Sequence, residues 1–399
     1  MAVPRFSPFA GLRYDPDAVA LADVLAPPYD VVDADEQAAL EARSPYNAVR
    51  LELPREEGGL DRYAAARRRL DEWRDAGVLV PDPEPAFYVY RMGWRTDDGG
   101  LRQTTGVIGA LELEPPGEGG VLPHERTMPK PKSDRLDLLR ACRANLSPVW
   151  GLSLTAGLTG LCEPSDPPLA RATDDAGVHH RLWRVTRPGT VAAIADAVAA
   201  SPVVIADGHH RYETALAYQA ERRAETDGPG EWDRVMVYVV ELADDQLSVG
   251  AIHRVVSGLP PGFDLLGALE TWFDAFPAGP SPVTLEEQMA DAQALALVLP
   301  DARWLLRPRP EALEEAADLD SARLDVARAA LPPHDLRYQH GAAAAVAQVE
   351  AGPAQAAFLL RPPSVARIAA AARAAERMPE KTTYFHPKPA TGLVFRPVE

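Results

Sequence analysis

The chain has 399 residues, 46% of them hydrophobic and 25% charged, so it has room for two or three globular domains with ample cores. Its net charge of −17 argues against a general nucleic-acid-binding protein, and its two cysteines exclude a disulfide scaffold and a cysteine-rich zinc site. Because the sequence shows neither a signal-peptide pattern nor the run of roughly 20 apolar residues that a spanning helix needs, we expect a cytoplasmic protein with no membrane partner.

The first 32 residues are rich in proline and aromatic side chains. Prolines fix extended backbone, so residues 5–32 predict a rigid loop or edge strand rather than a helix. Tyr29 and Asp30, which follow Pro27 and Pro28, have two interpretations. Either they line a pocket, or they only shape and pack a turn.

Residues 33–112 predict alternating helices and strands. Asp33 suits the cap of the first helix, because Glu36 follows three residues later. The segment Thr96-Asp97-Asp98-Gly99-Gly100 is a hairpin signal between the last two strands. In order, we expect a helix over 33–43, a strand over 46–53, a helix over 60–76 and strands over 86–94 and 103–112.

The mixed pattern continues to residue 258. After a polar loop, a helix is expected from about Ser133, with Leu136 and Leu139 on its apolar face. We therefore assign residues 1–258 to one α/β core domain. Its further predicted elements are a helix over 191–200 and strands over 179–185, 203–205, 234–241 and 247–251.

Past Pro260 the composition shifts toward alanine, leucine and proline. We assign residues 259–350 to an accessory α/β region that serves as a scaffold or as a homodimer surface. Residues 351–399 form a third part, whose polar tail we expect to return to the functional site. The predicted helices are 265–273, 285–295, 324–331, 342–349 and 364–377, and the predicted strands are 295–299, 302–307 and 356–360.

The stretch from Pro202 to Leu216 predicts a strand, a turn and a helix. Val203 to Ile205 are apolar and β-branched, which suits a buried strand. Asp207 suits a helix cap and Gly208 supplies backbone freedom. Since the start of a helix favours anions, the polar residues that follow make this junction the candidate active site: His209, His210 and Arg211.

Three segments, 124–132, 207–213 and 381–388, combine histidine, lysine or arginine with small hydroxyl residues. Such mixtures suit phosphate, because arginine gives a bidentate fork, lysine a point charge, and serine or threonine an oriented hydroxyl. We therefore predict a phosphate-bearing small-molecule ligand, and Mg²⁺ bound together with a nucleotide is more plausible here than a transition-metal site. The first and third segments supply the predicted binding residues His124, Arg126, Thr127, Lys132, Lys381, Thr382 and Lys388.

Other site chemistries have weaker support. His209 and His210 are adjacent, so on a helix they point about 100° apart, and no HExxH pattern offers a zinc site. Neither a G-x-S-x-G motif nor a cysteine motif supports a nucleophile, and neither a Walker loop nor a dinucleotide fingerprint is present. Acid–base chemistry has four candidates, Glu125, Asp207, His210 and Glu213, although Glu213 also suits a helix surface.

Five sequence blocks occur along the chain in the order found in a known protein family. They are Ala26-Pro-Pro-Tyr-Asp-Val-Val, His124-Glu-Arg-Thr-Met-Pro with Lys132 and Asp134-Arg135-Leu, Asn145-Leu-Ser-Pro-Val, Ile205-Ala-Asp-Gly-His-His-Arg-Tyr-Glu-Thr-Ala, and Met378-Pro-Glu-Lys-Thr-Thr-Tyr-Phe-His-Pro-Lys-Pro. Together they resemble the domain-of-unknown-function family 1015, and they span nearly the whole chain.

The turn Asp207-Gly208-His209-His210-Arg211 is also similar to the phosphate-binding turn of the ParB/sulfiredoxin superfamily. That superfamily includes sulfiredoxin, CTP-hydrolysing ParB and an ADP-dependent free-serine kinase. The resemblance implies a mixed α/β fold with a ParB/sulfiredoxin-like core, in which Gly208, His209, His210 and Arg211 bind nucleotide phosphates. The turn lacks the sulfiredoxin cysteine, and the net charge disfavours a DNA-binding ParB.

The predicted function is that of a nucleotide-dependent phosphotransferase or phosphohydrolase acting on a small hydroxylated metabolite, specifically serine or phosphoserine. His210, Arg211 and Lys381 are expected to neutralise phosphate charge, and Asp207 or Glu125 to orient or deprotonate the hydroxyl. Two alternatives remain, a ParB-like CTP switch associated with DNA and a metal-dependent hydrolase.

Overall fold

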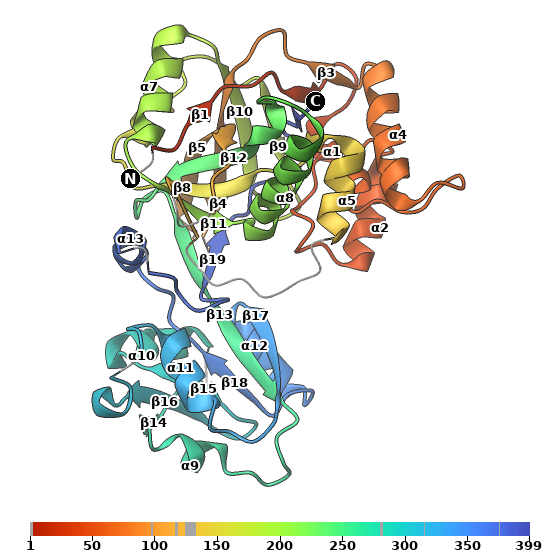
Figure 1. The fold of residues 1–399 in the computed structure, drawn as a ribbon. Helices are drawn as coiled ribbons and strands as arrows, with labels where there is room; N and C mark the ends of the chain where they lie inside the picture. Colours follow the sequence, from red (N-terminus) through yellow and green to blue (C-terminus); the bar gives the residue numbers. More distant parts are fainter. Residues whose placement is uncertain are drawn as a thin grey trace. The chain divides into compact units, whose positions relative to one another are not determined.

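A computed structural model describes residues 3–96, 99–115, 119–123, 133–279, 282–314, 316–374 and 376–399. The chain forms two compact units, each containing helices and strands (Figure 1). The first unit comprises Met1–Leu247 and Pro387–Glu399, and the second comprises Ser248–His386. The α/β class is therefore confirmed.

The unit boundaries differ from those expected after residues 258 and 350. Strand β13, Ser248–Ser257, pairs with β17 (Asp335–His340), β18 (Ala356–Leu359) and β19 (Thr383–His386). Since hydrogen bonding to these strands places β13 in the second unit, that unit begins at Ser248 and keeps the chain as far as His386. Only Pro387–Glu399 returns to the first unit.

A nine-stranded mixed sheet forms the centre of the described part of the first unit, in the order β6-β11-β8-β12-β5-β4-β10-β9, with β1 on β5. Strand β11 is parallel to β6, and β12 is parallel to β8, whereas the other pairs are antiparallel. The expected hairpin is confirmed as β4 and β5. The strands are β1 Phe6–Ser7, β4 Phe87–Arg95, β5 Leu101–Glu112, β6 Val121–Pro123, β8 Val149–Ser153, β9 Ala170–Thr173, β10 His179–Val185, β11 Val203–Asp207 and β12 Arg234–Glu241.

Two short strand pairs lie outside this sheet. Strand β2 (Leu12–Tyr14) pairs with β3 (Leu79–Pro81). Strand β7 (Ala144–Asn145) pairs with β20 (Arg396–Pro397), which hydrogen-bonds the last residues of the chain to the first unit.

The helices of the first unit support two hydrophobic cores. One combines the central sheet with α7 and α8 through Ile194, Val203 and Tyr212. The other combines α2, α3, α4 and α5 with Phe395 from the returning C-terminal segment. The bounds are α1 Leu21–Val24, α2 Ala34–Arg43, α3 Val49–Glu52, α4 Arg62–Asp75, α5 Ser133–Cys142, α6 Leu158–Leu161, α7 Pro188–Ala199 and α8 His209–Glu225, with a 3₁₀ turn, η1, at Glu231–Asp233.

The predicted strand over 46–53 is wrong, because Val49–Glu52 forms helix α3. The cause is Asn47, whose side-chain oxygen accepts a 3.0 Å hydrogen bond from the Val49 N–H. Its amide group donates to the carbonyls of Asp23 and Leu25 at 2.9 and 3.0 Å. A side chain that bonds the backbone two residues later favours a turn over an extended strand. The expected cap is confirmed in α2, where Asp33 accepts from the N–H groups of Asp35 and Glu36.

The second unit contains a seven-stranded sheet in its described residues, in the order β14-β16-β15-β18-β13-β17, with β19 on β13. Strands β14, β17 and β19 were not predicted. The remaining bounds are β14 Phe273–Pro277, β15 Leu295–Val298, β16 Arg303–Pro308, α9 Leu265–Leu269, α10 Pro282–Ala292, α11 Asp320–Arg328, α12 Ala342–Glu350, α13 Val365–Arg373 and a 3₁₀ turn, η2, at Pro310–Ala312. Among the helices described here, none combines the length and the apolar character needed to cross a membrane.

We predict that the second unit loses stability in acid through His253. This side chain is buried in β13, and its Nδ1 accepts a 3.2 Å hydrogen bond from the Leu360 N–H. Burial, followed by Arg254 and His340, lowers the pKa of His253 to about 4. Because an unfolded histidine takes up its proton near pH 6.5, the free energy of unfolding should fall by about 3 kcal/mol as the pH drops from 6.5 to 4.

The measurement is urea unfolding between pH 4 and pH 7. His253→Asn keeps an acceptor near the Nδ1 position but does not titrate in this range, so its unfolding free energy should vary less with pH. Equal pH dependence in the two proteins would contradict the assignment.

Candidate functional site

The strand, turn and helix predicted around Gly208 are confirmed. Strand β11 lies between β6 and β8 in the central sheet, and its residues from Val203 to Ala206 are buried. Its pairing with β8 is irregular between Ile205 and Asp207. Helix α8 begins immediately after Gly208. The end of a buried strand therefore delivers Asp207 to the start of a helix.

Gly208 is required by its backbone conformation and by a close neighbour. Its φ is +87°, in the left-handed region that favours glycine. A Cβ atom at this position would lie 2.9 Å from Nε of Arg211 and 3.0 Å from its Cζ. The absence of a side chain at Gly208 therefore leaves room for the Arg211 guanidinium.

Asp207 does not cap α8, contrary to the sequence prediction. The N-cap residue is Gly208, and no side-chain capping bond is formed there. The Asp207 carboxylate instead accepts from two cations, from Nη2 of Arg211 at 2.7 Å and from Nζ of Lys388 at 3.3 Å. Asp207 is therefore the shared anion of an ion-pair cluster and not a helix cap.

Arg211 is directed inward by further acceptors. Its Nη1 donates to the Pro148 carbonyl and, at 3.3 Å, to Oγ of Ser147. Burial disfavours the charged guanidinium, but the neighbouring Asp207, Tyr29 and Asp30 outweigh it and raise the pKa of Arg211. Arg211 therefore remains a fixed positive charge.

Lys388 brings the C-terminal segment into the same cluster. Its Nζ lies 2.5 Å from Oδ2 of Asp30 in addition to its contact with Asp207. Burial opposes the ammonium charge, but Asp207 and Asp30 prevail, so the pKa of Lys388 is raised. Lys388 thus joins two carboxylates from distant parts of the sequence.

A second layer of charge surrounds Tyr29. The Arg135 guanidinium lies 4.4 Å from the centre of the Tyr29 ring, which is a cation–π arrangement. Nη1 of Arg135 also donates to the backbone oxygen and to Oε2 of Glu52, at 2.8 and 3.1 Å. Burial raises the pKa of Tyr29, so its hydroxyl stays protonated at neutral pH.

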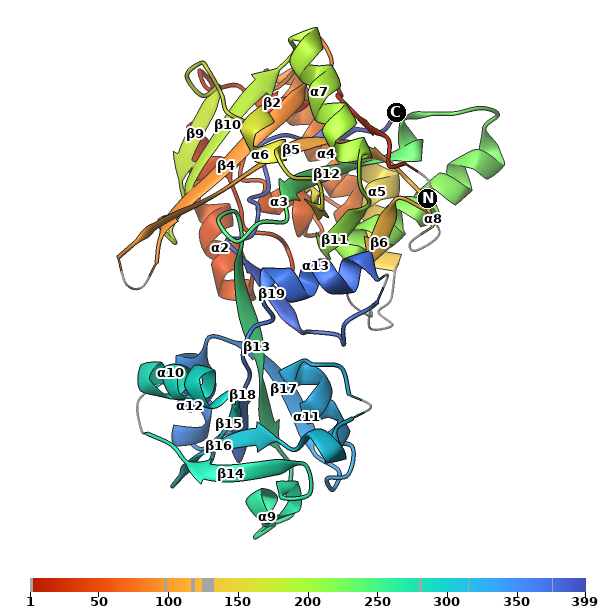
Figure 2. The same ribbon diagram turned by 90° about the vertical axis from the view of Figure 1, so that its left-hand side faces the viewer.

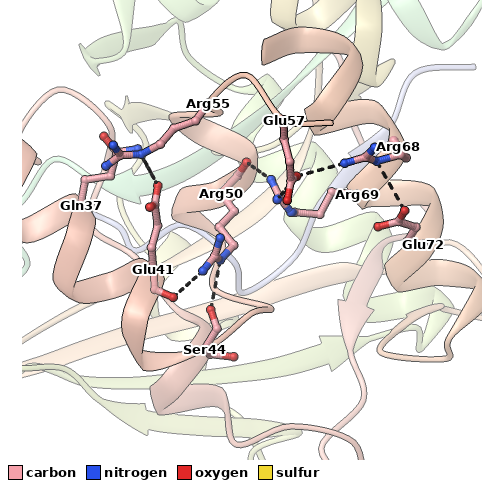
Figure 3. A network of polar contacts seen from close by, with 9 residues as sticks. All are labelled: Gln37, Glu41, Ser44, Arg50, Arg55, Glu57, Arg68, Arg69 and Glu72. Carbon is pink, nitrogen blue, oxygen red and sulfur yellow. Dashed lines mark hydrogen bonds and ion pairs between the residues drawn. The ribbon is translucent and has the colours of Figure 1, made fainter. Parts of the chain in front are cut away.

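A polar network joins α2 and α4 to α3, the short helix that ends at Glu52 (Figure 3). Arg50 of α3 donates to the Glu41 carbonyl at 2.5 Å. Arg69 of α4 donates to the Arg50 carbonyl at 3.5 Å and to Glu57 at 2.5 Å. These bonds fix the short helix whose last residue contacts Arg135.

A cavity of about 60 Å³ adjoins the cluster and has space for a small ligand group. Within the described part of the chain, two buried polar atoms in its lining have no hydrogen-bond partner, Nε of Arg211 and Oε1 of Glu52. Its polar lining is Tyr29, Glu52, Arg135, Asn145, Ser147, Arg211 and Thr214.

Other predicted site residues are spread over the chain. In the first turn of α8, Nδ1 of His210 lies 3.9 Å from Oε2 of Glu213, and His209 precedes it. Lys381 and Thr382 belong to the second unit. The Lys381 carbonyl accepts from Arg254 at 3.0 Å, and the buried Thr382 hydroxyl donates to the Pro379 carbonyl at 2.7 Å. The predicted residues His124, Glu125, Arg126, Thr127 and Lys132 lie outside the described residues.

The described residues around the site offer few groups for metal binding or for thiol chemistry. No cluster of three histidine, cysteine, aspartate or glutamate side chains suited to a metal occurs in the described ranges. Nζ of Lys388 already lies between the carboxylates of Asp30 and Asp207, so these two share a cation. Burial raises the pKa of Cys142 and of Cys162 to about 12, which keeps both thiols protonated and unreactive.

Of the two interpretations of Tyr29 and Asp30, the pocket one agrees with the structure for Tyr29, which lines the cavity, whereas Asp30 is not in its lining. Sequence reasoning did not single out Glu52, Arg135 or Ser147. Arg135 and Ser147 stand inside the family-like blocks, which was an available signal. Glu52 had none, because its segment was assigned to a strand.

We predict that Gly208→Ala disturbs the site by moving Arg211. An alanine in the left-handed region costs about 1–2 kcal/mol, and the clash with the guanidinium adds to it. Urea unfolding followed by tryptophan fluorescence measures the loss. Gly189→Ala is the matched control, because Gly189 lies in α7 with no atom within 4 Å of an added Cβ. The control should be neutral or stabilising, and equal effects of the two changes would contradict the steric account.

The comparisons with known proteins give low-identity likenesses to solved structures. A conserved hypothetical protein from Pyrococcus furiosus is 15% identical with a TM-score of 0.37, and the match covers 69% of this chain and 92% of that one. A free serine kinase in complex with AMP is 14% identical with a TM-score of 0.37, over 67% and 83% of the two chains. A C-terminally truncated SbnI from Staphylococcus aureus is 11% identical with a TM-score of 0.40, over 71% and 85%.

None of the curated proteins with which the chain was compared is significantly similar to it. A family model gives a match over most of the length, and the match includes four of the five blocks of the sequence. It matches residues 6–327 and is described as a protein of unknown function, DUF1015, so the chain belongs to that family.

Proposed function

We propose that the first unit binds nucleotide phosphates beside Asp207, Arg211 and Lys388 and catalyses phosphoryl transfer to, or removal from, a small hydroxylated metabolite. One observation carries this proposal. Two cations with side chains only 14% and 13% exposed, Arg211 and Lys388, meet on one carboxylate at the start of α8.

The charges support an exchange of anions at this position. A cation with little access to water needs an anionic partner, and here Asp207 and Asp30 supply it. A phosphate oxygen can replace a carboxylate oxygen, because guanidinium and ammonium groups form charge-assisted hydrogen bonds with both. The start of the 17-residue helix α8 adds a favourable dipole for the incoming phosphate.

Asp207 then has a second role. When phosphate takes over part of the charge on Arg211 and Lys388, the Asp207 carboxylate can accept the proton of a substrate hydroxyl. The hydroxyl oxygen forms the new bond to phosphorus, and the bond to the leaving nucleotide oxygen breaks. His210, next to this position in the chain, is a further group able to carry a proton.

The ligand identities in the proposal come from the resemblance of the Asp207–Arg211 turn. They are ADP or ATP with Mg²⁺ as the phosphoryl donor and free serine or phosphoserine as the metabolite. Mg²⁺ would be held mainly by the nucleotide phosphates and water. Glu125, Lys381 and the other residues of the polar segments 124–132 and 381–388 remain predicted contributors.

We predict that Arg211→Ala weakens nucleotide binding at least tenfold. The change removes charge-assisted hydrogen bonds worth about 1.5–3 kcal/mol, and each 1.4 kcal/mol corresponds to a factor of ten in affinity. Isothermal titration calorimetry with ADP, ATP and CTP in the presence of Mg²⁺ measures the effect.

The matched control is Arg222→Ala, since Arg222 lies on the same helix but pairs with the exposed Glu225. It should leave the affinity unchanged. Lys388→Ala is an independent second variant, and urea unfolding identifies any variant that fails to fold. Unchanged nucleotide affinity in folded Arg211→Ala and Lys388→Ala would refute the assignment of the site.

We predict that Asp207→Asn lowers kcat about 10²- to 10⁴-fold, the usual contribution of a positioned general base. Asparagine keeps the shape but cannot take the proton, so the nucleotide affinity should not fall by more than a few-fold. Turnover of ADP or ATP with serine, or of phosphoserine, is followed by ³¹P NMR. Full activity in Asp207→Asn would exclude it as the base. CTP binding without turnover, together with salt-sensitive retention of duplex DNA, would favour the nucleotide switch instead.

A further inference from the structure

The β9 edge of the central sheet carries a row of arginines that the proposed function does not use. The pairing register places Arg171 of β9 opposite Arg181 of β10, and Arg181 opposite Arg91 of β4. Figure 2 shows these three strands side by side. Directly opposed like charges destabilise a sheet. Two such pairs in a chain of net charge −17 therefore point to an anion on this face.

Arg91 stands where the buried part of this sheet face ends. Its neighbours toward the core, Val89 and Trp183, belong to the hydrophobic cluster of the sheet. The Arg91 guanidinium lies 5.5 Å from the centre of the Trp183 ring, and its Nε donates to Oγ1 of Thr105 at 2.9 Å. Its Nη2 forms a 2.9 Å ion pair with Glu163. Arg91 is therefore preorganised, with one carboxylate partner.

Beyond Arg91, the sheet face forms a cavity of about 440 Å³. This volume lies in the range of small-molecule sites. Three arginines on this face of the sheet line it, Arg91, Arg95 and Arg181, together with His179. No carboxylate is among its described lining residues, although acidic residues outnumber basic ones in the whole chain by 58 to 41.

The cations of this cavity are poorly neutralised by the protein. Arg181 is exposed and, in the described ranges, makes no hydrogen bond or ion pair. Arg95 donates to the Gly99 carbonyl at 3.3 Å. Carbonyl oxygens orient a guanidinium without cancelling its charge. The cavity thus has an excess of positive charge.

We infer that this cavity binds a small molecule carrying two or more phosphate groups. Guanidinium groups bind phosphate oxygens bidentately, and several converging arginines match a ligand with several negative charges. Adjacent strands lie about 4.8 Å apart, so Arg181 and Arg91 can contact neighbouring phosphates of one ligand. The cavity shares no lining residue with the one beside Arg211, so this inference does not depend on the proposed function.

The test is calorimetric titration of the full chain with inorganic tripolyphosphate, and in parallel with ATP. Arg181→Gln should weaken tripolyphosphate binding at least tenfold. Arg171→Gln is the matched control, because it removes the same charge from the neighbouring strand but lies outside the cavity lining. It should change the affinity no more than about threefold. Equal affinities for tripolyphosphate and ATP would show that the cavity recognises phosphates alone. Tighter binding of ATP would show that it also contacts the nucleoside, and both results support the site.

A double variant distinguishes binding in this cavity from binding at the Arg211 site. In Arg211→Ala, tripolyphosphate should still bind with one equivalent, and adding Arg181→Gln should remove that binding. If Arg211→Ala does not fold, Lys388→Ala serves as the background. Equal losses in Arg181→Gln and Arg171→Gln would indicate diffuse attraction and overturn the site. Retention of single-stranded DNA without tripolyphosphate binding would likewise overturn it in favour of a nucleic-acid surface.

Discussion

The carboxylate of Asp207 is the constraint on which the candidate site depends. Arg211 lies four residues away on the next helix, whereas Lys388 is 181 residues away in the chain, and both donate to this one side chain. Neither cation is well hydrated, and burying an uncompensated charge costs several kcal/mol. The cluster therefore forms only when β11, the start of α8 and the C-terminal segment are all in place. Asp30 completes it from the proline-rich N-terminal loop.

The cluster requires contacts between segments that are far apart in the sequence. In the sequence, the whole second unit, Ser248–His386, stands between Lys388 and the rest of the first unit. The return is secured by Arg396, which is fully buried and donates to Oε2 of Glu231 at 2.5 Å. Pairing of β20 with β7 adds backbone hydrogen bonds. Two kinds of bond thus anchor the segment that supplies Lys388, which explains how a residue near the chain end can be a fixed site charge.

The basic clusters of this acidic chain differ in how far carboxylates neutralise them, and the sequence alone does not show this difference. The run Arg67-Arg68-Arg69 is the most conspicuous basic feature of the sequence, and each member pairs with carboxylates such as Asp71, Glu72 and Glu57. It is a compensated outer surface, as expected for a charge run on a helix. Arg91 and Arg181 are 90 residues apart and form no visible motif, yet strand register makes them neighbours. Strand register, rather than local density in the sequence, brings these two arginines together.

The sequence by itself determined the α/β class, the hairpin of β4 and β5, and the strand–turn–helix around Gly208, because alternation, turn residues and β-branched runs are local signals. It failed at Val49–Glu52, where the buried Asn47 side chain turns an alternating segment into a helix. It also assigned Asp207 to a cap. Only the tertiary structure decided that Asp207 instead joins Arg211 to Lys388, and that Glu52 faces Arg135. The physical reason is that a carboxylate forms its strongest bonds with whichever cations folding brings near it, and residues distant in sequence cannot be ranked as partners from local patterns.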